Sequence, residues 1–290
     1  MKDTSFYQKH TLNCKGKLIF LDEPKIMGIL NITPDSFYKN SRTNITNLVE
    51  KARLMINDGA DFLDIGGYSS RPGAIDISEE DELMRVMPAI ELLMREFPDT
   101  LISIDTFRSK VAKEAVEAGA SLINDITGGD GDDQMFKTVS DLKVPYILMH
   151  MRGTPQNMQS KTKYDDLLGE MIYYFSKRIN ELTEHGVNDI ILDPGFGFAK
   201  TIEQNYYLLD HLHDLSVLKL PVMVGLSRKS LIWKTLNINP EEALNGTTVL
   251  NTIALLNNAK ILRVHDVKQA KELINLVTFM RVEKDDGTKH

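Results

Sequence analysis

Polar side chains that could bind a ligand follow each of eight short apolar runs in this chain. The runs span residues 25–30, 61–65, 101–104, 121–123, 145–149, 189–192, 221–224 and 260–264. The polar residues at or just after their ends are Asn31, Asp64, Asp105, Asn124, Asp125, His150, Asp193, Ser227, Arg228, Lys229, Arg263 and His265. Each run has the length and composition of a buried strand. If the strands are parallel, their ends meet on one face, and the polar residues form one candidate site.

The candidate site contains two kinds of binding group. Carboxylates accept hydrogen bonds and amides both donate and accept them, which suits a flat heterocycle with adjacent N–H donors and carbonyl acceptors. This first set comprises Asp105, Asn124, Asp193 and Lys229. A second set combines amide, hydroxyl, guanidinium and imidazole groups, as recognition of a phosphate requires. It comprises Asn31, Ser70, Arg71, Arg263 and His265. The residues therefore predict a site that binds a ring beside a phosphate.

Some of these residues have a simpler structural explanation. Asp and Asn that follow a strand commonly cap helices or stabilise turns. Asp64 precedes a Gly-Gly pair and Asp125 precedes a Thr-Gly-Gly sequence, so we expect both to be turn acceptors. His150 has no second His four residues later, and we expect it to pack or hydrogen-bond rather than to bind a metal.

The order of elements predicts an α/β fold, a single (β/α)8 TIM barrel. Between the runs, apolar residues recur at helical spacing, as in the series Leu83, Val86, Met87, Ile90 and Leu93. Strands that are apolar throughout are typical of a parallel sheet covered on both faces. A doubly wound open sheet is the alternative.

We expect three parts along the chain. Residues 1–24 form an N-terminal extension with a short hairpin over 11–20, which turns at Gly16 and covers the barrel floor. Residues 25–282 form the barrel, and residues 283–290 form a disordered tail. Three long loops, 31–44, 66–77 and 150–162, follow strands, and loops of this length in a compact domain are usually functional or disordered.

Composition excludes several classes of protein. The 290 residues are 42% hydrophobic and 26% charged, which is typical of one soluble domain, and the net charge of −7 argues against nucleic-acid binding. No stretch approaches the roughly 18 apolar residues of a membrane span, and the first residues lack a signal-peptide core, so we expect a cytoplasmic protein. The single cysteine, Cys14, excludes an internal disulfide. Residues 225–230 lack the glycine spacing of a nucleotide-binding loop.

Seven segments, in order across nearly the whole chain, resemble the dihydropteroate synthase family. They are MGILNITPDSF (27–37), DIGGYSSRPG (64–73), SIDT (103–106), INDI (123–126), DPGFGF (193–198), SRKS (227–230) and RVHDV (263–267). The resemblance implies a transferase of folate biosynthesis and a sulfonamide target. Such an enzyme joins a pterin methyl diphosphate to 4-aminobenzoate and releases pyrophosphate. It also implies a Mg2+ ion as cofactor and a homodimer formed through C-terminal helices.

The resemblance assigns roles that agree with the two sets above. Pterin binding falls to Asp105, Asn124, Met149, Asp193, Phe198 and Lys229, and diphosphate binding to Asn31, Ser70, Arg71, Arg263 and His265. Asn31 would also bind the metal. The aminobenzoate site would be formed by Phe37, Arg71, Pro72 and Ser230, and the catalytic residues would be Asp105, Lys229, Arg263 and His265.

Two departures from the family pattern affect loops. The usual Glu-Ser-Thr-Arg-Pro is Tyr68-Ser69-Ser70-Arg71-Pro72 here, and residues 37–41 lack the Ser-Asp-Gly-Gly turn of many relatives. The predicted contacts remain, because the hydroxyl of Ser70 replaces that of Thr. Loop conformation and affinity for aminobenzoate or sulfonamides are the properties that these changes would alter.

Two other functions compete with this prediction. A methyltetrahydrofolate-dependent corrinoid methyltransferase has a similar pterin-binding barrel but binds no diphosphate, so the phosphate set argues against it. A barrel that binds a pterin or a partner without turnover is the non-enzymatic alternative, and the complete phosphate set argues against that as well.

Overall fold

The computed structural model describes residues 11–32, 42–69 and 76–285 of the chain. Eight parallel strands are hydrogen-bonded in the order β8-β7-β6-β5-β4-β3-β10-β9. Their bounds are β3 Lys25–Asn31, β4 Phe62–Gly66, β5 Leu101–Asp105, β6 Leu122–Asp125, β7 Tyr146–Met149, β8 Ile190–Asp193, β9 Met223–Val224 and β10 Ile261–Val264. A parallel bridge between Leu192 and Val222 brings β8 to β9 and closes the ring. The predicted barrel is confirmed, and the open sheet is excluded.

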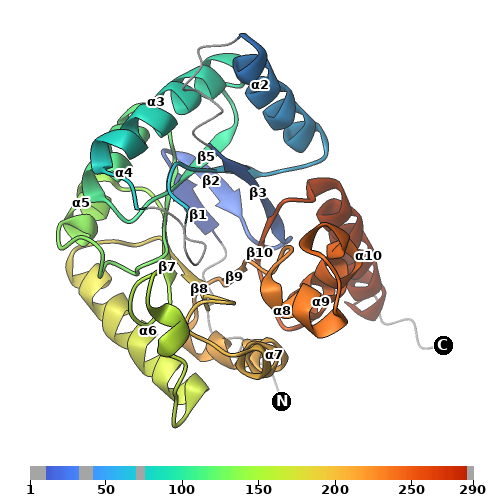
Figure 1. The fold of residues 1–290 in the computed structure, drawn as a ribbon. Helices are drawn as coiled ribbons and strands as arrows, with labels where there is room; N and C mark the ends of the chain where they lie inside the picture. The colour runs from blue at the N-terminus through green and yellow to red at the C-terminus, as the bar shows by residue number, and fades with distance from the viewer. Residues whose placement is uncertain (1–10, 33–41, 70–75, 286–290) are drawn as a thin grey trace.

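Helices surround the strands as a ring, which Figure 1 shows along the barrel. They are α2 Arg42–Asn57, α3 Glu79–Glu96, α4 Ser109–Glu117, α5 Met135–Leu142, α6 Leu167–Glu184, α7 Ile202–Asp210, α8 Ser230–Leu236, α9 Leu244–Leu256 and α10 Val267–Asp285, with short 3-10 turns at Met158–Ser160, Leu212–Leu218 and Pro240–Glu242. Local sequence fixes several helix starts. Ser78 accepts a hydrogen bond from the Asp81 N–H at the start of α3, and Thr201 and Gln204 form a capping box at α7.

Successive side chains along each strand point to opposite faces of the sheet, so they belong to two separate hydrophobic clusters. Residues such as Ile26, Leu63 and Ile102 point outward and belong to the large core shared with the helices. Their neighbours Met27 and Phe62 point inward and belong to a second cluster in the barrel interior. The strands therefore read as continuous apolar runs because both of their faces are covered.

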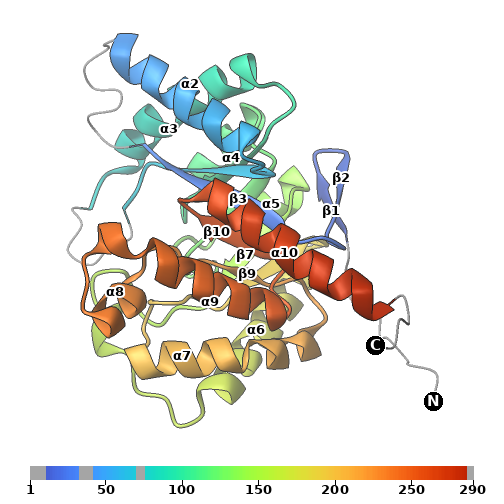
Figure 2. The ribbon, with the colours of Figure 1, turned by 90° about the vertical axis from the view of Figure 1, so that its right-hand side faces the viewer.

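The N-terminal hairpin seals one end of the barrel. β1 (Thr11–Cys14) and β2 (Lys17–Phe20) pair antiparallel, and Gly16, at φ 90°, forms the turn as predicted. Leu12 and Cys14 belong to the same cluster as Met27 and Phe62. Figure 2 shows the hairpin at one side of the barrel. Because the first inward residues of the strands contact the hairpin cluster, this end is the barrel floor.

The helix bounds refine two sequence predictions. Helix α2 begins at Arg42, two residues before the predicted end of the first loop, and α10 continues to Asp285, three residues into the predicted tail. Residues 33–41, 70–75 and 286–290, which include most of the first loop and much of the second, lie outside the described residues. Within the described part, no helix combines the length and the apolar composition needed to cross a membrane.

Candidate functional site

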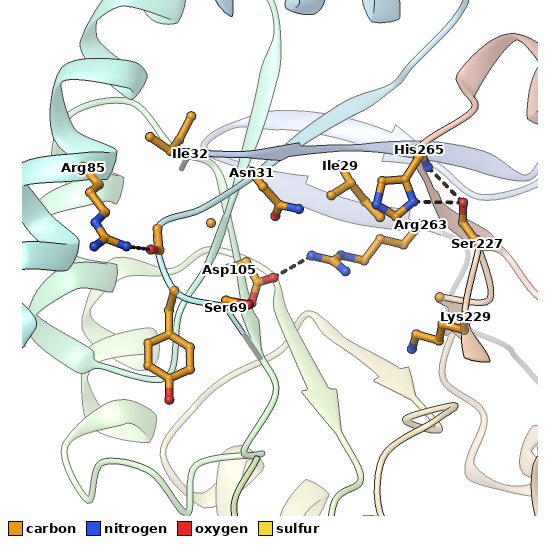
Figure 3. A pocket seen from close by; sticks show the side chains of 14 residues that line it. Ile29, Asn31, Ile32, Ser69, Arg85, Asp105, Ser227, Lys229, Arg263 and His265 are labelled. Carbon is orange, nitrogen blue, oxygen red and sulfur yellow. Dashed lines mark hydrogen bonds and ion pairs between the residues drawn. The ribbon is translucent and has the colours of Figure 1, made fainter. Parts of the chain in front are cut away.

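A cavity of about 260 Å3 lies at the carboxyl ends of the strands, opposite the hairpin. Figure 3 shows the side chains that line it. They are Ile29, Asn31, Ile32, Gly66, Gly67, Tyr68, Ser69, Arg85, Asp105, Gly225, Ser227, Lys229, Arg263 and His265. Six of the polar residues predicted at the strand ends therefore share one cavity: Asn31, Asp105, Ser227, Lys229, Arg263 and His265.

The alternation of the strands explains why the upper interior is polar. In β4, Asp64 is two residues after the inward Phe62, and in β6, Asn124 is two residues after the inward Leu122. Residues two apart in a strand face the same side, so Asp64 and Asn124 project into the interior. The floor of the interior is thus apolar and its upper layer carries carboxylates, amides and a guanidinium.

Arg263 connects the carboxylates of two neighbouring strands. Its Nε donates to Asp64 Oδ2 at 2.6 Å, and its Nη2 donates to Asp105 Oδ2 at 2.5 Å. Figure 3 shows the side chain extending from β10 toward Asp105. Burial works to lower the pKa of Arg263, but Asp64 and Asp105 raise it above its ordinary value, so the guanidinium is charged. A charged fork between two acids fixes all three side chains.

Asp64 corrects one prediction from the sequence. It is fully buried in the interior and accepts hydrogen bonds from Arg263 and, at 3.2 Å, from Asn124 Nδ2, and it stabilises no turn in the described part of the chain. The Gly pair at 66–67 suggested a turn residue. The signal that would have placed it correctly is its position two residues after Phe62, on the inward face.

Asp125 behaves as the sequence predicted. It faces away from the interior and accepts hydrogen bonds from the backbone N–H groups of Thr127 and Gly129, and from the hydroxyl of Tyr146 at 2.7 Å. Burial raises the pKa of this carboxyl, and these hydrogen bonds lower it. The side chain therefore holds the loop after β6 in place.

The remaining predicted ring-binding residues lie beside the cavity, at and after the ends of β6, β7 and β8. Asn124 is only 2% exposed, and Asp193 is 6% exposed and accepts the Gly195 N–H at 2.8 Å. Burial raises the pKa of Asp193, while Lys229 and Arg263 lower it, which places their charges near this carboxyl. Met149 is buried in an apolar cluster against which Phe198 packs. Asp193 and Arg263 therefore open toward the same interior.

Lys229 lines the cavity and lies near enough to Asp193 for the two charges to interact. Its Nζ donates to the carbonyl of Phe196 and lies 4.9 Å from the centre of the Phe198 ring. Burial lowers the pKa of Lys229 to about 8, and Asp193 opposes that shift. Ser230 begins α8 directly after it. The lysine thus presents its amine toward the interior from the start of a helix.

The surroundings of Asp105 shift the pKa of its carboxyl group. Burial raises the pKa of Asp105 to about 7, against the charge of Arg263, which lowers it, and with a further rise from Asp64. An acid with this pKa changes charge near neutral pH. Such shifts are common where a carboxylate binds or reacts.

His265 and Ser227 form a pair on the other side of the cavity. Ser227 Oγ lies 3.0 Å from His265 Nδ1 and accepts the His265 backbone N–H at 3.2 Å. The neighbouring Arg228 turns away and binds Asp266 through Nε and Nη2, at 2.9 and 2.8 Å. Arg228 therefore links the loop after β9 to the loop after β10.

Four predicted site residues, Phe37, Ser70, Arg71 and Pro72, lie outside the described residues. Conversely, the cavity includes polar side chains outside the predicted set, Tyr68, Ser69 and Arg85. Arg85 donates to the Gly67 carbonyl at 3.0 Å from helix α3. Its position on a helix gave no strand-end signal, which explains the omission.

The described residues show no preformed metal cage, since they contain no group of three or more His, Cys, Asp or Glu side chains suited to a metal ion. His150 is buried and its Nδ1 lies 3.2 Å from Lys200 Nζ, so it packs and hydrogen-bonds as predicted. Asn31 is exposed at the cavity wall, which makes its amide oxygen a candidate ligand for an ion. One amide suits a Mg2+ ion that takes its other ligands from phosphate and water.

Comparison with known proteins identifies the class of the chain. A family model described as "Pterin binding enzyme" matches residues 27–265. The dihydropteroate synthase of Escherichia coli (strain K12) is 41% identical over 269 residues, which cover 92% of this chain and 95% of that protein. The fold and the site thus define a pterin-binding barrel.

Solved structures agree with this class. The Yersinia pestis dihydropteroate synthase in complex with a sulfonamide drug has a TM-score of 0.88 and 40% identity, and the match covers 94% of this chain and 99% of that chain. The Xanthomonas albilineans dihydropteroate synthase with 4-aminobenzoic acid has a TM-score of 0.86 and 37% identity, with coverage of 94% and 98%. The chain belongs to the dihydropteroate synthase family.

Proposed function

We propose that this protein condenses 6-hydroxymethyl-7,8-dihydropterin diphosphate with 4-aminobenzoate to give 7,8-dihydropteroate and pyrophosphate, a step of folate biosynthesis. The observation that carries the proposal is the position of Arg263. It joins the buried carboxylate of Asp64 to the partly buried carboxylate of Asp105, and it lines the same cavity as Lys229 and His265. A ring site and an anion site therefore meet at one guanidinium.

The pterin ring would occupy the polar interior. Asp105, Asn124, Asp193 and Lys229 offer acceptors and donors to a flat heterocycle, and Met149 and Phe198 supply apolar contact. Asp64 Oδ1 and Ser103 Oγ, which lie on paired positions of β4 and β5, are buried and have no hydrogen-bond partner among the described residues. Buried polar atoms without partners are costly, and a ligand with N–H and carbonyl groups would satisfy them.

The diphosphate would bind at the cavity mouth, near Asn31, Arg263 and His265. Ser70 and Arg71 remain predictions for the same group, because they lie outside the described residues. Mg2+ would be held by Asn31 and by diphosphate oxygens. When bound, the ion would neutralise negative charge on the leaving group. This arrangement fits the exposed amide of Asn31.

Catalysis would depend on stabilising separated charge. The bond between the pterin methylene carbon and the diphosphate oxygen breaks, and pyrophosphate leaves with the bonding electrons. The neutral amine of 4-aminobenzoate then attacks the methylene cation and loses a proton. Asp105 and Asp193 would favour the cationic ring, while Arg263 and His265 would stabilise the leaving anion. Preorganised groups of this kind contribute about 3 kcal/mol each to lowering a barrier.

The aminobenzoate would enter from the loop side of the cavity. Ser230, at the start of α8, follows Lys229 and is partly exposed. Phe37, Arg71 and Pro72 remain predictions for this site, because they lie outside the described residues. Binding of 4-aminobenzoic acid and of a sulfonamide by the related enzymes supports the same ligand class here.

We also propose a cytoplasmic homodimer that uses the C-terminal helices. Large apolar side chains are exposed on α8, α9 and α10, which lie together in Figure 1. They are Leu236, Val249, Leu256, Leu276, Phe279 and Met280. Apolar surface of this kind is stabilised by association. Sedimentation equilibrium would test the dimer, and a monomer at micromolar concentration would contradict it.

A titration with magnesium and pyrophosphate separates the proposal from the methyltransferase alternative. A synthase should bind pyrophosphate saturably in the presence of Mg2+, and His265→Ala should weaken this binding at least tenfold. A corrinoid methyltransferase has no diphosphate to bind and should show no saturation. Formation of dihydropteroate by the same preparation then excludes a barrel that binds without turnover.

A further inference from the structure

A second lysine is buried behind the pterin subsite and takes no part in the chemistry described above. Lys200 is only 4% exposed. Its Nζ lies 3.2 Å from His150 Nδ1, 3.2 Å from the Gly195 carbonyl oxygen and 3.1 Å from the Phe198 carbonyl oxygen. A buried cation is stable only when its donors are satisfied. These three contacts surround the buried amine with polar partners.

The three partners can satisfy the amine of Lys200 in full. As an ammonium it can donate to both carbonyls and to an unprotonated His150 Nδ1, and as a neutral amine it can donate to both carbonyls and accept from a protonated Nδ1. Burial lowers the pKa of His150 well below its ordinary value, so its ring is neutral and Nδ1 can accept. Burial also lowers the pKa of Lys200 to about 7, while Asp193 raises it.

The turn between β8 and α7 depends on this contact. Gly195 and Gly197 have φ values of 68° and 80°, and Ala199 has φ 47° although it carries a Cβ. This conformation turns the carbonyls of Gly195 and Phe198 toward the buried amine. The Tyr164 hydroxyl donates to the Ala199 carbonyl at 3.0 Å and holds the same segment from outside. A left-handed Ala persists only where surrounding contacts impose it.

The same turn carries the pterin subsite on its other side. Asp193 precedes it, Phe198 lies within it, and Lys229 donates to the carbonyl of Phe196 from the cavity side. The backbone between Asp193 and Lys200 is therefore held between two lysines. Only Lys229 reaches the cavity, whereas Lys200 contacts the turn from behind.

We propose that Lys200 is a positioning residue for the pterin subsite. Through its contacts with His150 Nδ1 and the carbonyls of Gly195 and Phe198, its amine fixes the turn after β8 so that Asp193 and Phe198 face the barrel interior. The inference rests on the proposed function in one respect, since it takes the ligand of this subsite to be the pterin.

The main test replaces the ammonium with a side chain of similar length. Lys200→Met should raise the KM for the pterin diphosphate at least tenfold, while the KM for 4-aminobenzoate changes less than twofold. The control is Lys137→Met, which removes a lysine whose side chain is 64% exposed, and it should keep both KM values. A purely structural role would lower the amount of active enzyme and reduce kcat without this separation.

A pair of His150 variants tests the acceptor. His150→Gln retains an acceptor oxygen and should keep the pterin KM within threefold of the wild type. His150→Leu removes the acceptor and should reproduce the increase in pterin KM. If Lys200→Met does not fold, this pair decides the question, together with Tyr164→Phe, which removes one contact to the same turn and should raise the pterin KM about threefold.

The outcomes separate the two proposals. A wild-type protein that forms no dihydropteroate and binds no pterin contradicts the proposed function. An active wild-type protein whose Lys200→Met variant keeps its pterin KM overturns the positioning role. Equal increases in both KM values, or equal effects of the two His150 variants, overturn it as well.

Discussion

Arg263 is the residue whose removal has the clearest consequence. Without its guanidinium, the fully buried Asp64 and the partly buried Asp105 remain close together with no cation between them. An unpaired buried charge of this kind costs about 3 kcal/mol or more. Loss of the guanidinium should therefore affect both the site and the stability of the upper barrel.

We predict that Arg263→Ala lowers kcat/KM for the pterin diphosphate at least 100-fold, and that Lys229→Ala has an effect of similar size. The reason is the loss of a charged donor at the junction of the ring and phosphate sites. Steady-state kinetics measure the effect, and circular dichroism confirms folding. Arg95→Ala, at a side chain 72% exposed, is the control and should retain wild-type activity. Normal turnover of both site variants would remove these assignments.

The pH dependence of kcat/KM for the pterin diphosphate should follow the titration of Asp105. Its pKa is raised to about 7, mainly by burial, with Arg263 lowering it and Asp64, Glu82 and Asp125 raising it further. The carboxylate is thus present above about pH 7 and lost as the pH falls through that value. We expect kcat/KM for the pterin diphosphate to decrease below pH 7. Asp105→Asn should lack this acidic limb, and an unchanged limb in that variant would assign the titration to another group.

The sequence predicts the roles of some site residues and not of others. Arg263, Asp105 and Asn124 were found because each ends an apolar run. Asp64 was assigned to a turn because a Gly pair follows it, although its true partner, Arg263, is 199 positions away. Lys200 and Arg85 gave no local signal at all, since only tertiary packing places their side chains.

Among the elements, the loop after β6 is held in place by Asp125, which lies outside the barrel interior and next to the site residue Asn124. Gly129 donates its N–H to Asp125 at 2.9 Å and has φ 88°. A Cβ at this position would lie 2.3 Å from the ring of Phe136. Both the backbone conformation and the space therefore require glycine.

Gly129→Ala should reduce the free energy of unfolding by about 2–4 kcal/mol. The added Cβ would strain the left-handed backbone at this position and would also clash with the ring of Phe136. Gly186→Ala is a matched comparison, because Gly186 also has a positive φ, 83°, but its added Cβ would meet only Ser140 Oγ at 3.9 Å. It should lose only about 1 kcal/mol. Urea denaturation measures both. Equal losses would show that the contact with Phe136 contributes nothing.

The strands were the best predicted elements. All eight predicted runs are strands, and most of their ends differ by one residue. Several strands continue to the polar residue after the run, as at Asn31, Asp105 and Asp193, because the hydrogen-bonded ladder does not end where the apolar residues end. The start of α2 was less predictable, since residues 42–44 are polar and carry no helical pattern of apolar residues.

At the scale of the whole molecule, the barrel has an apolar closed end and a polar open end. The hairpin residue Leu12 is fully buried against the first inward residues of the strands. The site lies at the opposite end. Stability and catalysis should therefore be separable, as is typical of this fold.

Leu12→Ala should lower the free energy of unfolding by about 2–5 kcal/mol, because it opens a cavity in the floor cluster. Both KM values should stay within twofold of the wild type at a temperature where the variant is folded. Leu18→Ala lies in the same hairpin at a side chain 58% exposed, and it should change stability by less than about 0.5 kcal/mol. A floor variant with altered KM and normal stability would contradict the separation.

Pyrophosphate release, measured together with dihydropteroate formation, tests the central claim that one barrel interior binds the pterin ring and its diphosphate for transfer to an arylamine. The account predicts one pyrophosphate for each dihydropteroate, a rate that saturates with 4-aminobenzoate, and loss of both products in Arg263→Ala. Folded wild-type protein that releases no pyrophosphate in the presence of Mg2+ and both substrates would contradict it.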